Sequence, residues 1–368
     1  MYISENINEF DKIQNIYRNF PTGRLIDISN SITKKYFQNK IYIRGLIEFS
    51  NICFNDCKYC GIRLSNRSVN RYELSNEKIL SIIEKGYRNG IRTFVLQSGE
   101  RSYLNSDYNI KKKSSNTPAN LKTISLKFIE KVDKLLIEIR RRYSDEVAIT
   151  LSCGVYERKT YQDWFNLGAN RYLLRFETSS GDLYEDLCPG KSFSRRIQAL
   201  QDLSDIGYEV GSGFLIGLPG ETEEITINNL LLCKMLRLDM VGIGPFLAHP
   251  ETPLAKFPSV DIEQVLKITS LLRILLPESN IPATTATGTL DKLGWEKALS
   301  SGANVLMINI SPAEIKKEYL LYPGKICIYE DGFKYLSGLK VKLEKIGKQL
   351  CFERGDSLTS KRKIGINR

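Results

Sequence analysis

The sequence has few of the residues that build zinc sites and disulfide scaffolds. It contains one histidine, His249, and eight cysteines among 368 residues. Zinc takes four ligands, commonly from paired Cys or His motifs, so the scarcity of histidine disfavours zinc. The cysteines are also too few for a disulfide framework in a chain of this length, and clustered cysteines in a reducing compartment are more often metal ligands.

Long hydrophobic runs are missing as well. No uninterrupted apolar run approaches the ~18 residues that a membrane span needs. The first residues, MYISENINEFDKI, are charged and lack the apolar core of a signal peptide. We therefore expect a cytoplasmic protein with no membrane partner.

The positive charge is not concentrated in one segment. The net charge is +11, but Lys and Arg are spread along the chain, with short concentrations at residues 111–113 and 360–363. An RNA-binding or RNA-modifying protein would be expected to carry an appended basic recognition domain, and the sequence has none. We interpret the charge as a solvated basic surface and expect no nucleic-acid partner.

Short β-rich runs alternate with longer segments of helical period. The eight candidate strands are residues 41–49, 93–97, 147–152, 171–177, 209–217, 240–246, 281–285 and 304–309. Eight strand and helix units in series predict an α/β fold, a parallel (β/α)8 TIM barrel, with its chemistry at the carboxyl ends of the strands. We expect an N-terminal helical extension at 1–40, the barrel at 41–330 with a polar insertion at 101–121, and a C-terminal helix with a basic tail at 331–368.

Three cysteines follow the first predicted strand, in NICFNDCKYCGIR. Cys53, Cys57 and Cys60 cannot complete a four-thiolate iron–sulfur cubane, so one iron would stay open for chemistry. The interleaved polar residues argue against three cysteines that merely fill a core. An electron-transfer cluster remains an alternative, and it would require a fourth cysteine near the triplet.

Other strand ends carry polar residues. QSGE (97–100) ends the second strand, and the run that ends in RFET contributes Glu177 beside Arg175, with Arg171 four residues earlier. Charged groups inside a barrel are costly unless they are paired or bind a ligand. A simple strand-ending turn at 97–100, and internal ion pairing of the arginines, remain alternatives.

The CxxxCxxC spacing, with Tyr59 before the last cysteine, resembles the radical S-adenosylmethionine (SAM) superfamily. The stretches IEFSNICFNDCKYCGIR, LQSGE, GANRYLLRFET, GYEVGSGFLIGLPGET, DMVGIGPFLAHPETPL, RILLPESNIPATTATGTL, GANVLMINISP and YLLYPGKIC resemble the HydE family, radical SAM maturases of [FeFe]-hydrogenase. Methylornithine synthase, in the same biotin-synthase-like group, is the nearest alternative. The resemblance implies a radical SAM barrel with one [4Fe–4S] cluster and SAM as cofactors.

The resemblance also implies the site residues. Cys53, Cys57 and Cys60 would hold the cluster. SAM would contact Tyr59, Gln97, Ser98, Gly99, Glu100, Thr150, Ser152, Glu177, Arg196 and Met240. The substrate would contact Arg44, Arg171, Arg175, Thr284, Thr285, Met307 and Tyr319, although an inward Met307 is more often a core residue.

The implied substrate is a small anionic complex in which cysteine binds an iron carbonyl cyanide unit. The implied partners are the HydG and HydF maturases and a low-potential reductant, and we expect a monomer. Two departures from the family pattern concern the substrate: Val155 stands where members often have a carboxylate, and Cys188 stands in place of a histidine. Because Cys327 and Cys351 are the cysteines that remain near the C-terminus, we expect no second cluster.

Overall fold

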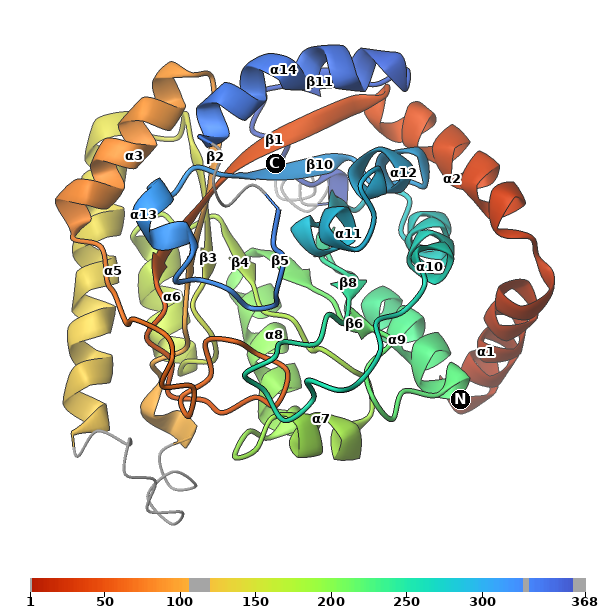
Figure 1. The fold of residues 1–368 in the computed structure, drawn as a ribbon, viewed down its shortest axis with the longest axis horizontal. Helices are drawn as coiled ribbons and strands as arrows, with labels where there is room; N and C mark the ends of the chain where they lie inside the picture. Colours follow the sequence, from red (N-terminus) through yellow and green to blue (C-terminus); the bar gives the residue numbers. More distant parts are fainter. Residues whose placement is uncertain (1, 106–119, 327–330, 360–368) are drawn as a thin grey trace.

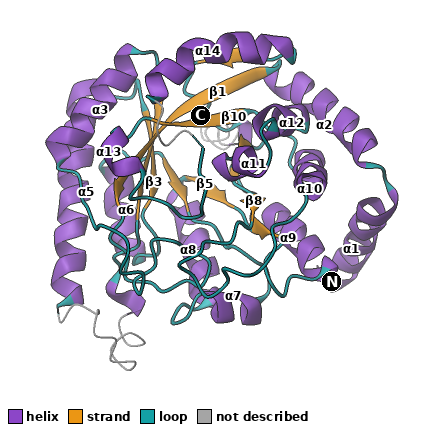
Figure 2. Ribbon diagram, in the orientation of Figure 1, coloured by secondary structure: helices purple, strands orange, loops and turns teal. Residues whose placement is uncertain are grey.

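The structure is a computed structural model that describes residues 2–105, 120–326 and 331–359. Strands lie at its centre and helices surround them (Figures 1 and 2). The strands are β1 (Lys40–Ser50), β2 (Thr93–Ser98), β3 (Ala148–Ser152), β4 (Arg171–Leu173), β5 (Glu209–Ser212), β6 (Leu215–Ile216), β7 (Met240–Val241), β8 (Gly244–Pro245), β9 (Pro282–Ala283), β10 (Val305–Asn309) and β11 (Gln349–Cys351). The helices are α1 (Tyr2–Asn19), α2 (Thr22–Phe37), α3 (Asn76–Arg88), η1 (Tyr103–Asn105), α5 (Leu121–Tyr143), α6 (Arg158–Asn166), α7 (Gly181–Leu187), α8 (Phe193–Ile206), α9 (Glu223–Met235), α10 (Ile262–Leu275), α11 (Thr285–Leu290), α12 (Gly294–Ser300), α13 (Ala313–Lys316) and α14 (Gly332–Lys345).

The sheet is a parallel barrel. Its strands are ordered β7-β5-β4-β3-β2-β1-β10-β9, and a parallel bridge between Met240 and Asn280 joins the two ends of this row. The predicted α/β barrel is confirmed, and each of the eight predicted runs contains a strand. Two runs are divided into two short strands. The fifth is interrupted at Gly213, whose φ of +149° departs from strand geometry and brings its backbone against Gly242.

The first two helices pack on the outside of the barrel, α1 against α9 and α2 against α10 (Figure 1). Helix α2 buries Leu25, Ser29, Thr33 and Phe37. Their spacing of four residues places them on one face of the helix. This face explains why a polar sequence before the first strand forms a stable helix.

The C-terminal segment covers the amino-terminal end of the barrel, opposite the loops that follow the strands. Strand β11, which the sequence did not predict, pairs with the start of β1 through Tyr42 and Cys351. Further along, Gly355 lies so close to the Tyr42 ring that a Cβ would meet its Cγ at 2.7 Å. Residues 106–119 of the predicted insertion, residues 360–368 of the predicted tail and Cys327 lie outside the described residues.

Within the described ranges, no helix is both long enough and apolar enough to cross a membrane.

Candidate active site

A pocket lies at the carboxyl ends of the strands, where the chemistry of such a barrel is expected. Of the residues predicted from the sequence, those that line it are Cys53, Cys57, Tyr59, Cys60, Gln97, Ser98, Gly99, Glu100, Ser152, Arg175, Glu177, Arg196 and Tyr319. These residues come from distant parts of the chain, and barrel closure brings them together. Further lining residues that the sequence did not single out include Asn55, Lys191, Phe246 and Tyr322.

The loop that carries the three cysteines is held by backbone contacts. The Arg71 guanidinium donates hydrogen bonds to the carbonyl oxygens of Asn51 and Ile62, at 2.8 Å each, and to those of Arg63 and Asn66. One side chain therefore ties both ends of the loop together. No sequence pattern indicates this role for Arg71, because it depends on how the loop folds back.

Glycine permits two close approaches after β2 and β3, one to the cysteine loop and one to Glu100. A Cβ on Gly99 would lie 2.4 Å from the Ile52 carbonyl oxygen, and one on Gly154 would lie 2.1 Å from Cγ of Glu100. Gly154 also has a φ of +97°, which side chains rarely adopt. Both positions thus require glycine, and the space at Gly154 is taken by Glu100.

Glu100 is buried between two cations. Lys191 Nζ lies 3.0 Å and Arg196 Nη2 3.7 Å from Glu100 Oε2, and all three side chains are less than a tenth exposed. Burial alone would raise the pKa of Glu100, but Lys191 and then Arg196 outweigh it and lower that pKa. Burial alone would likewise lower the pKa of Lys191, yet Cys57 and Glu100 hold it well above its usual value.

Helix α8 places Arg196 in this cluster. The Ser192 side chain caps the helix by accepting from the Arg195 backbone N–H. Arg196 therefore falls in the first turn, on the buried face that continues with Ala199 and Leu203. The family resemblance assigns Arg196 to SAM binding but gives Lys191 no role. Lys191 precedes the Ser192 cap, in a loop without a regular sequence pattern.

Glu177 has a strained backbone, with a φ of +68°. Non-glycine residues in this region cost free energy and cluster at functional sites. Its Oε2 lies 3.2 Å from Arg175 Nη2, although neither atom has a partner with hydrogen-bond geometry among the described residues. A polar ligand in the pocket could therefore use both side chains.

Cys188, which the sequence marks as a departure from the family pattern, lies beside the triplet, a position that the sequence did not predict. The Cys188 thiol hydrogen-bonds to Cys57 and lies 3.6 Å from the Tyr59 hydroxyl. This hydrogen bond, followed by the charge of Lys191, lowers the pKa of Cys57, whereas burial raises the pKa of Cys53 and Cys60. Cys188 packs in an apolar cluster behind Cys57 and does not line the pocket.

A loop after α13 covers part of the pocket. It contributes Tyr319, Leu321 and Tyr322 to the lining, and Leu321 accepts a hydrogen bond from the Gly61 N–H at 2.9 Å. The buried side chains of Lys325 and Glu48 form an ion pair that anchors this loop to β1. The loop is thus fixed to both the barrel and the cysteine loop.

Several predicted residues lie outside the pocket lining. Arg44 Nη1 contacts the Met240 sulfur at 2.6 Å inside the barrel, and Arg44 Nε, Arg44 Nη2 and the Thr150 hydroxyl are buried without a hydrogen-bond partner among the described residues. Burial and then Arg171 lower the pKa of Arg44. Thr285 and Met307 line a small separate cavity, and Thr284 is the residue before helix α11.

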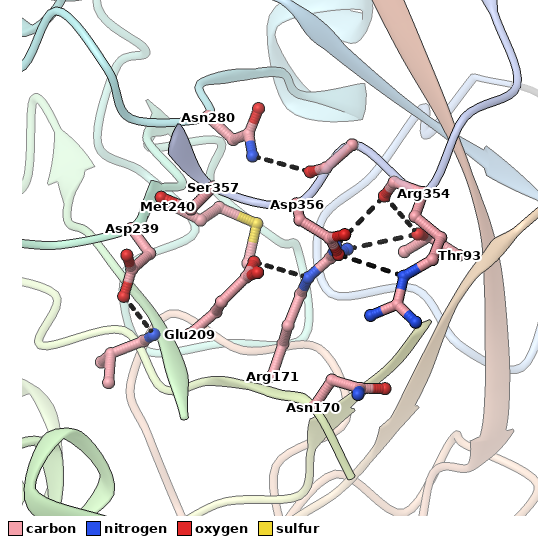
Figure 3. A network of polar contacts seen from close by, with 12 residues as sticks. Thr93, Asn170, Arg171, Glu209, Asp239, Met240, Asn280, Arg354, Asp356 and Ser357 are labelled. Carbon is pink, nitrogen blue, oxygen red and sulfur yellow. Dashed lines mark hydrogen bonds and ion pairs between the residues drawn. The ribbon is translucent and has the colours of Figure 1, made fainter. Parts of the chain in front are cut away.

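Arg171 lies outside the pocket lining, in a polar network with Glu209, Asp356 and Arg354 (Figure 3). Its Nε is 2.7 Å from Glu209 Oε2, its Nη2 is 2.6 Å from Asp356 Oδ1, and further bonds reach the Thr93 hydroxyl and the Arg354 carbonyl. The structure therefore separates Arg171 from Arg175 and the pocket, and the substrate role expected for Arg171 stays a prediction. Arg171 begins β4, whereas the pocket lies beyond its end.

Comparisons with known proteins agree with this geometry. Residues 47–231 match the model of the radical SAM superfamily. The chain is 39% identical to the [FeFe] hydrogenase maturase subunit HydE of Thermotoga maritima over 88% of this chain and 86% of that protein. It belongs to the HydE family of radical SAM enzymes.

Other members of the superfamily are more distant from this HydE-family enzyme. It is 29% identical to 3-methylornithine synthase of Methanosarcina acetivorans over 80% of this chain and 76% of that protein. The crystal structure of methylornithine synthase (PylB) superposes with a TM-score of 0.72 at 25% identity, covering 94% of this chain and 93% of that one.

The pocket fits the cofactors of this family, a [4Fe–4S] cluster and SAM. Cys53, Cys57 and Cys60 supply three thiol donors at its wall, as a cluster with one open iron requires. Partners for the amino acid group of SAM are also present: the open backbone at Gly99, the carboxylate of Glu100, and the buried cations Lys191 and Arg196. We expect these residues to hold the cluster and SAM.

Replacing Arg196 with alanine is expected to weaken SAM binding by ~1.5–3 kcal/mol, because a hydrogen bond to a charged group would be lost. Isothermal titration calorimetry of the reconstituted enzyme measures this change, and the cluster absorption spectrum should stay the same. Arg195→Ala is the matched control, since Arg195 is exposed and donates to the Leu104 carbonyl. Equal SAM affinity in the two variants would contradict the assignment.

Proposed function

We propose that this enzyme acts in [FeFe]-hydrogenase maturation on a small anionic complex of cysteine with an iron carbonyl cyanide unit. The observation that carries the proposal is the 39% identity to HydE, which extends over most of both chains. The motifs around the barrel mouth and the loop of Tyr319 belong to the region that resembles this family. HydG and HydF maturases would be its partners, in the cytoplasm.

When bound and supplied with one electron by a low-potential reductant, the cluster and SAM provide a 5′-deoxyadenosyl radical. The chain itself provides position, charge and exclusion of water. Glu100 and Arg196 would orient the amino acid end of SAM, and Glu177 would accept hydrogen bonds from its polar groups. The anchored loop of Tyr319 and Tyr322 would keep water from the reacting atoms.

Unpaired polar groups inside the barrel support an anionic substrate. The Arg44 guanidinium is buried, with two nitrogen atoms that have no partner among the described residues. Leaving a buried charge without partners is costly, and an anion beside it would remove the cost. Arg175 lies at the pocket wall, and two of its nitrogen atoms have no hydrogen-bond partner among the described residues. A cysteine-derived carboxylate could bind to Arg175, which lines the pocket.

The proposal is tested by the product. Reduced enzyme, incubated with SAM and the iron–cysteine complex, is expected to give adenosine joined to the cysteine sulfur, and mass spectrometry detects this compound. Enzyme without reductant is the control, because it cannot cleave SAM. A reaction that yields 5′-deoxyadenosine alone, with hydrogen taken from an amino acid substrate, would contradict the proposal.

That second outcome corresponds to a methylornithine-synthase-like enzyme. The superposition with methylornithine synthase at a TM-score of 0.72 supports this alternative, as does the Val155 departure. Val155 is buried and its backbone N–H donates to Glu100. Its side chain cannot offer the carboxylate that HydE-family members often carry there, so the product experiment is needed to decide.

A further inference from the structure

Lys191 is a buried lysine in the pocket to which neither the sequence motifs nor the comparisons give a role. Its side chain is 9% exposed and its Nζ lies 3.0 Å from Glu100 Oε2. A buried ammonium is costly unless it is paired. The loop that carries it is fixed, because the Lys191 N–H donates to the Cys188 carbonyl at 3.0 Å.

The charges around Lys191 are unequal. Lys191 and Arg196 both face the same oxygen of Glu100, so two cations share one carboxylate. At the pocket wall as a whole, Arg175 and Glu177 form a second, balanced pair. Among the carboxylates and cations of the pocket wall, one positive charge is therefore in excess, and it lies beside Glu100, in the pocket that the cluster cysteines also line.

We propose that Lys191 binds the carboxylate of SAM together with Arg196. The proposal goes beyond the assigned family residues and depends on SAM as the cofactor, but it does not depend on the substrate. The amino and carboxylate groups of SAM are attached to one carbon atom, so their protein partners must be neighbours. If Glu100 takes the amino group, the cations next to Glu100 lie where the carboxylate must be.

The test compares SAM with decarboxylated SAM, which lacks the carboxylate. Lys191→Met removes the charge and keeps the length of the side chain. It is expected to weaken SAM binding about 10- to 100-fold, the equivalent of losing a hydrogen bond to a charged group. Binding of decarboxylated SAM should change less than about twofold. Lys191→Arg should restore most of the SAM affinity.

Lys58→Met is the matched control. Lys58 lies near the same cysteines, but its ammonium forms an exposed ion pair with Asp186 at 2.6 Å. The Lys58→Met substitution also removes one positive charge, and its SAM affinity should stay within about twofold of the wild-type value. Both variants are measured by calorimetry on protein with a complete cluster, which absorption and iron content verify. If Lys191→Met does not hold a cluster, Lys191→Gln replaces it in the same comparison.

Two results would overturn the proposal. An unchanged SAM affinity in Lys191→Met would show that Lys191 does not contact the cofactor. An equal loss for SAM and decarboxylated SAM would show that Lys191 acts by holding Glu100 instead. Neither result bears on the maturation proposal, which depends on the product formed from the iron–cysteine complex.

Discussion

Replacing Cys57 with alanine is expected to abolish the [4Fe–4S] cluster, the largest effect that we predict for a single substitution. Three thiolates are the minimum for a cubane with one open iron, and the loss of one leaves two irons without a protein ligand. After anaerobic reconstitution, iron analysis and absorption spectra should show about four irons per chain in the wild type and essentially none in the variant.

Cys188→Ala is the informative control, because Cys188 hydrogen-bonds to Cys57 but does not line the pocket. This variant should keep its cluster and its ability to cleave SAM. If Cys188 were a fourth ligand, as in an electron-transfer cluster, Cys188→Ala would lose iron as Cys57→Ala does. Retention of a SAM-reducible cluster in Cys57→Ala would contradict the ligand assignment itself.

Replacing Arg171 with methionine is expected to lower the free energy of unfolding by ~3–5 kcal/mol, because removing one partner of a buried ion pair leaves uncompensated charge. Glu209 would lose this cation at the base of the barrel, and Asp356 would keep its pair with Arg354 at 3.2 Å. Denaturant unfolding followed by tryptophan fluorescence measures the change.

Arg158→Met is the control for this experiment. Arg158 is half exposed and pairs with Asp202 at 3.0 Å, so its removal should cost less than about 1 kcal/mol. The comparison also decides the role that the family resemblance gave to Arg171. If Arg171 binds substrate, its variant would unfold like the wild type and lose turnover alone.

The sequence predicts the barrel and the centre of the pocket because both depend on local patterns. Apolar runs of strand length mark the strands, and the cysteine spacing lies within one loop. Loops after parallel strands meet at one end of a barrel, so the order of strands along the chain is enough to place Glu100 and Glu177 near the cysteines.

Residues missed by the sequence interpretation depend on contacts between distant segments. Cys188 reaches Cys57, and Lys191 reaches Glu100, through a loop between α7 and α8 that has no periodic pattern. Strand β11 has three residues, too few for a pattern to be recognised. The separation of Arg171 from the pocket has a different cause. A strand advances about 3.3 Å per residue, so Arg171 and Arg175 lie at different depths of the barrel although both belong to one predicted strand.

The pairing of β1 has a consequence for biosynthesis. Tyr42 pairs with Val305 of β10 on one side and with Cys351 of β11 on the other. At translation rates of about 5–20 residues per second, the ribosome delivers β10 roughly 13 to 50 s after β1. The cysteine loop therefore emerges long before the barrel can close around it. The complete pocket, whose lining extends to Tyr322, forms only after most of the chain has been made. Chaperones or iron donors that act earlier would meet three accessible thiols on an unfinished sheet.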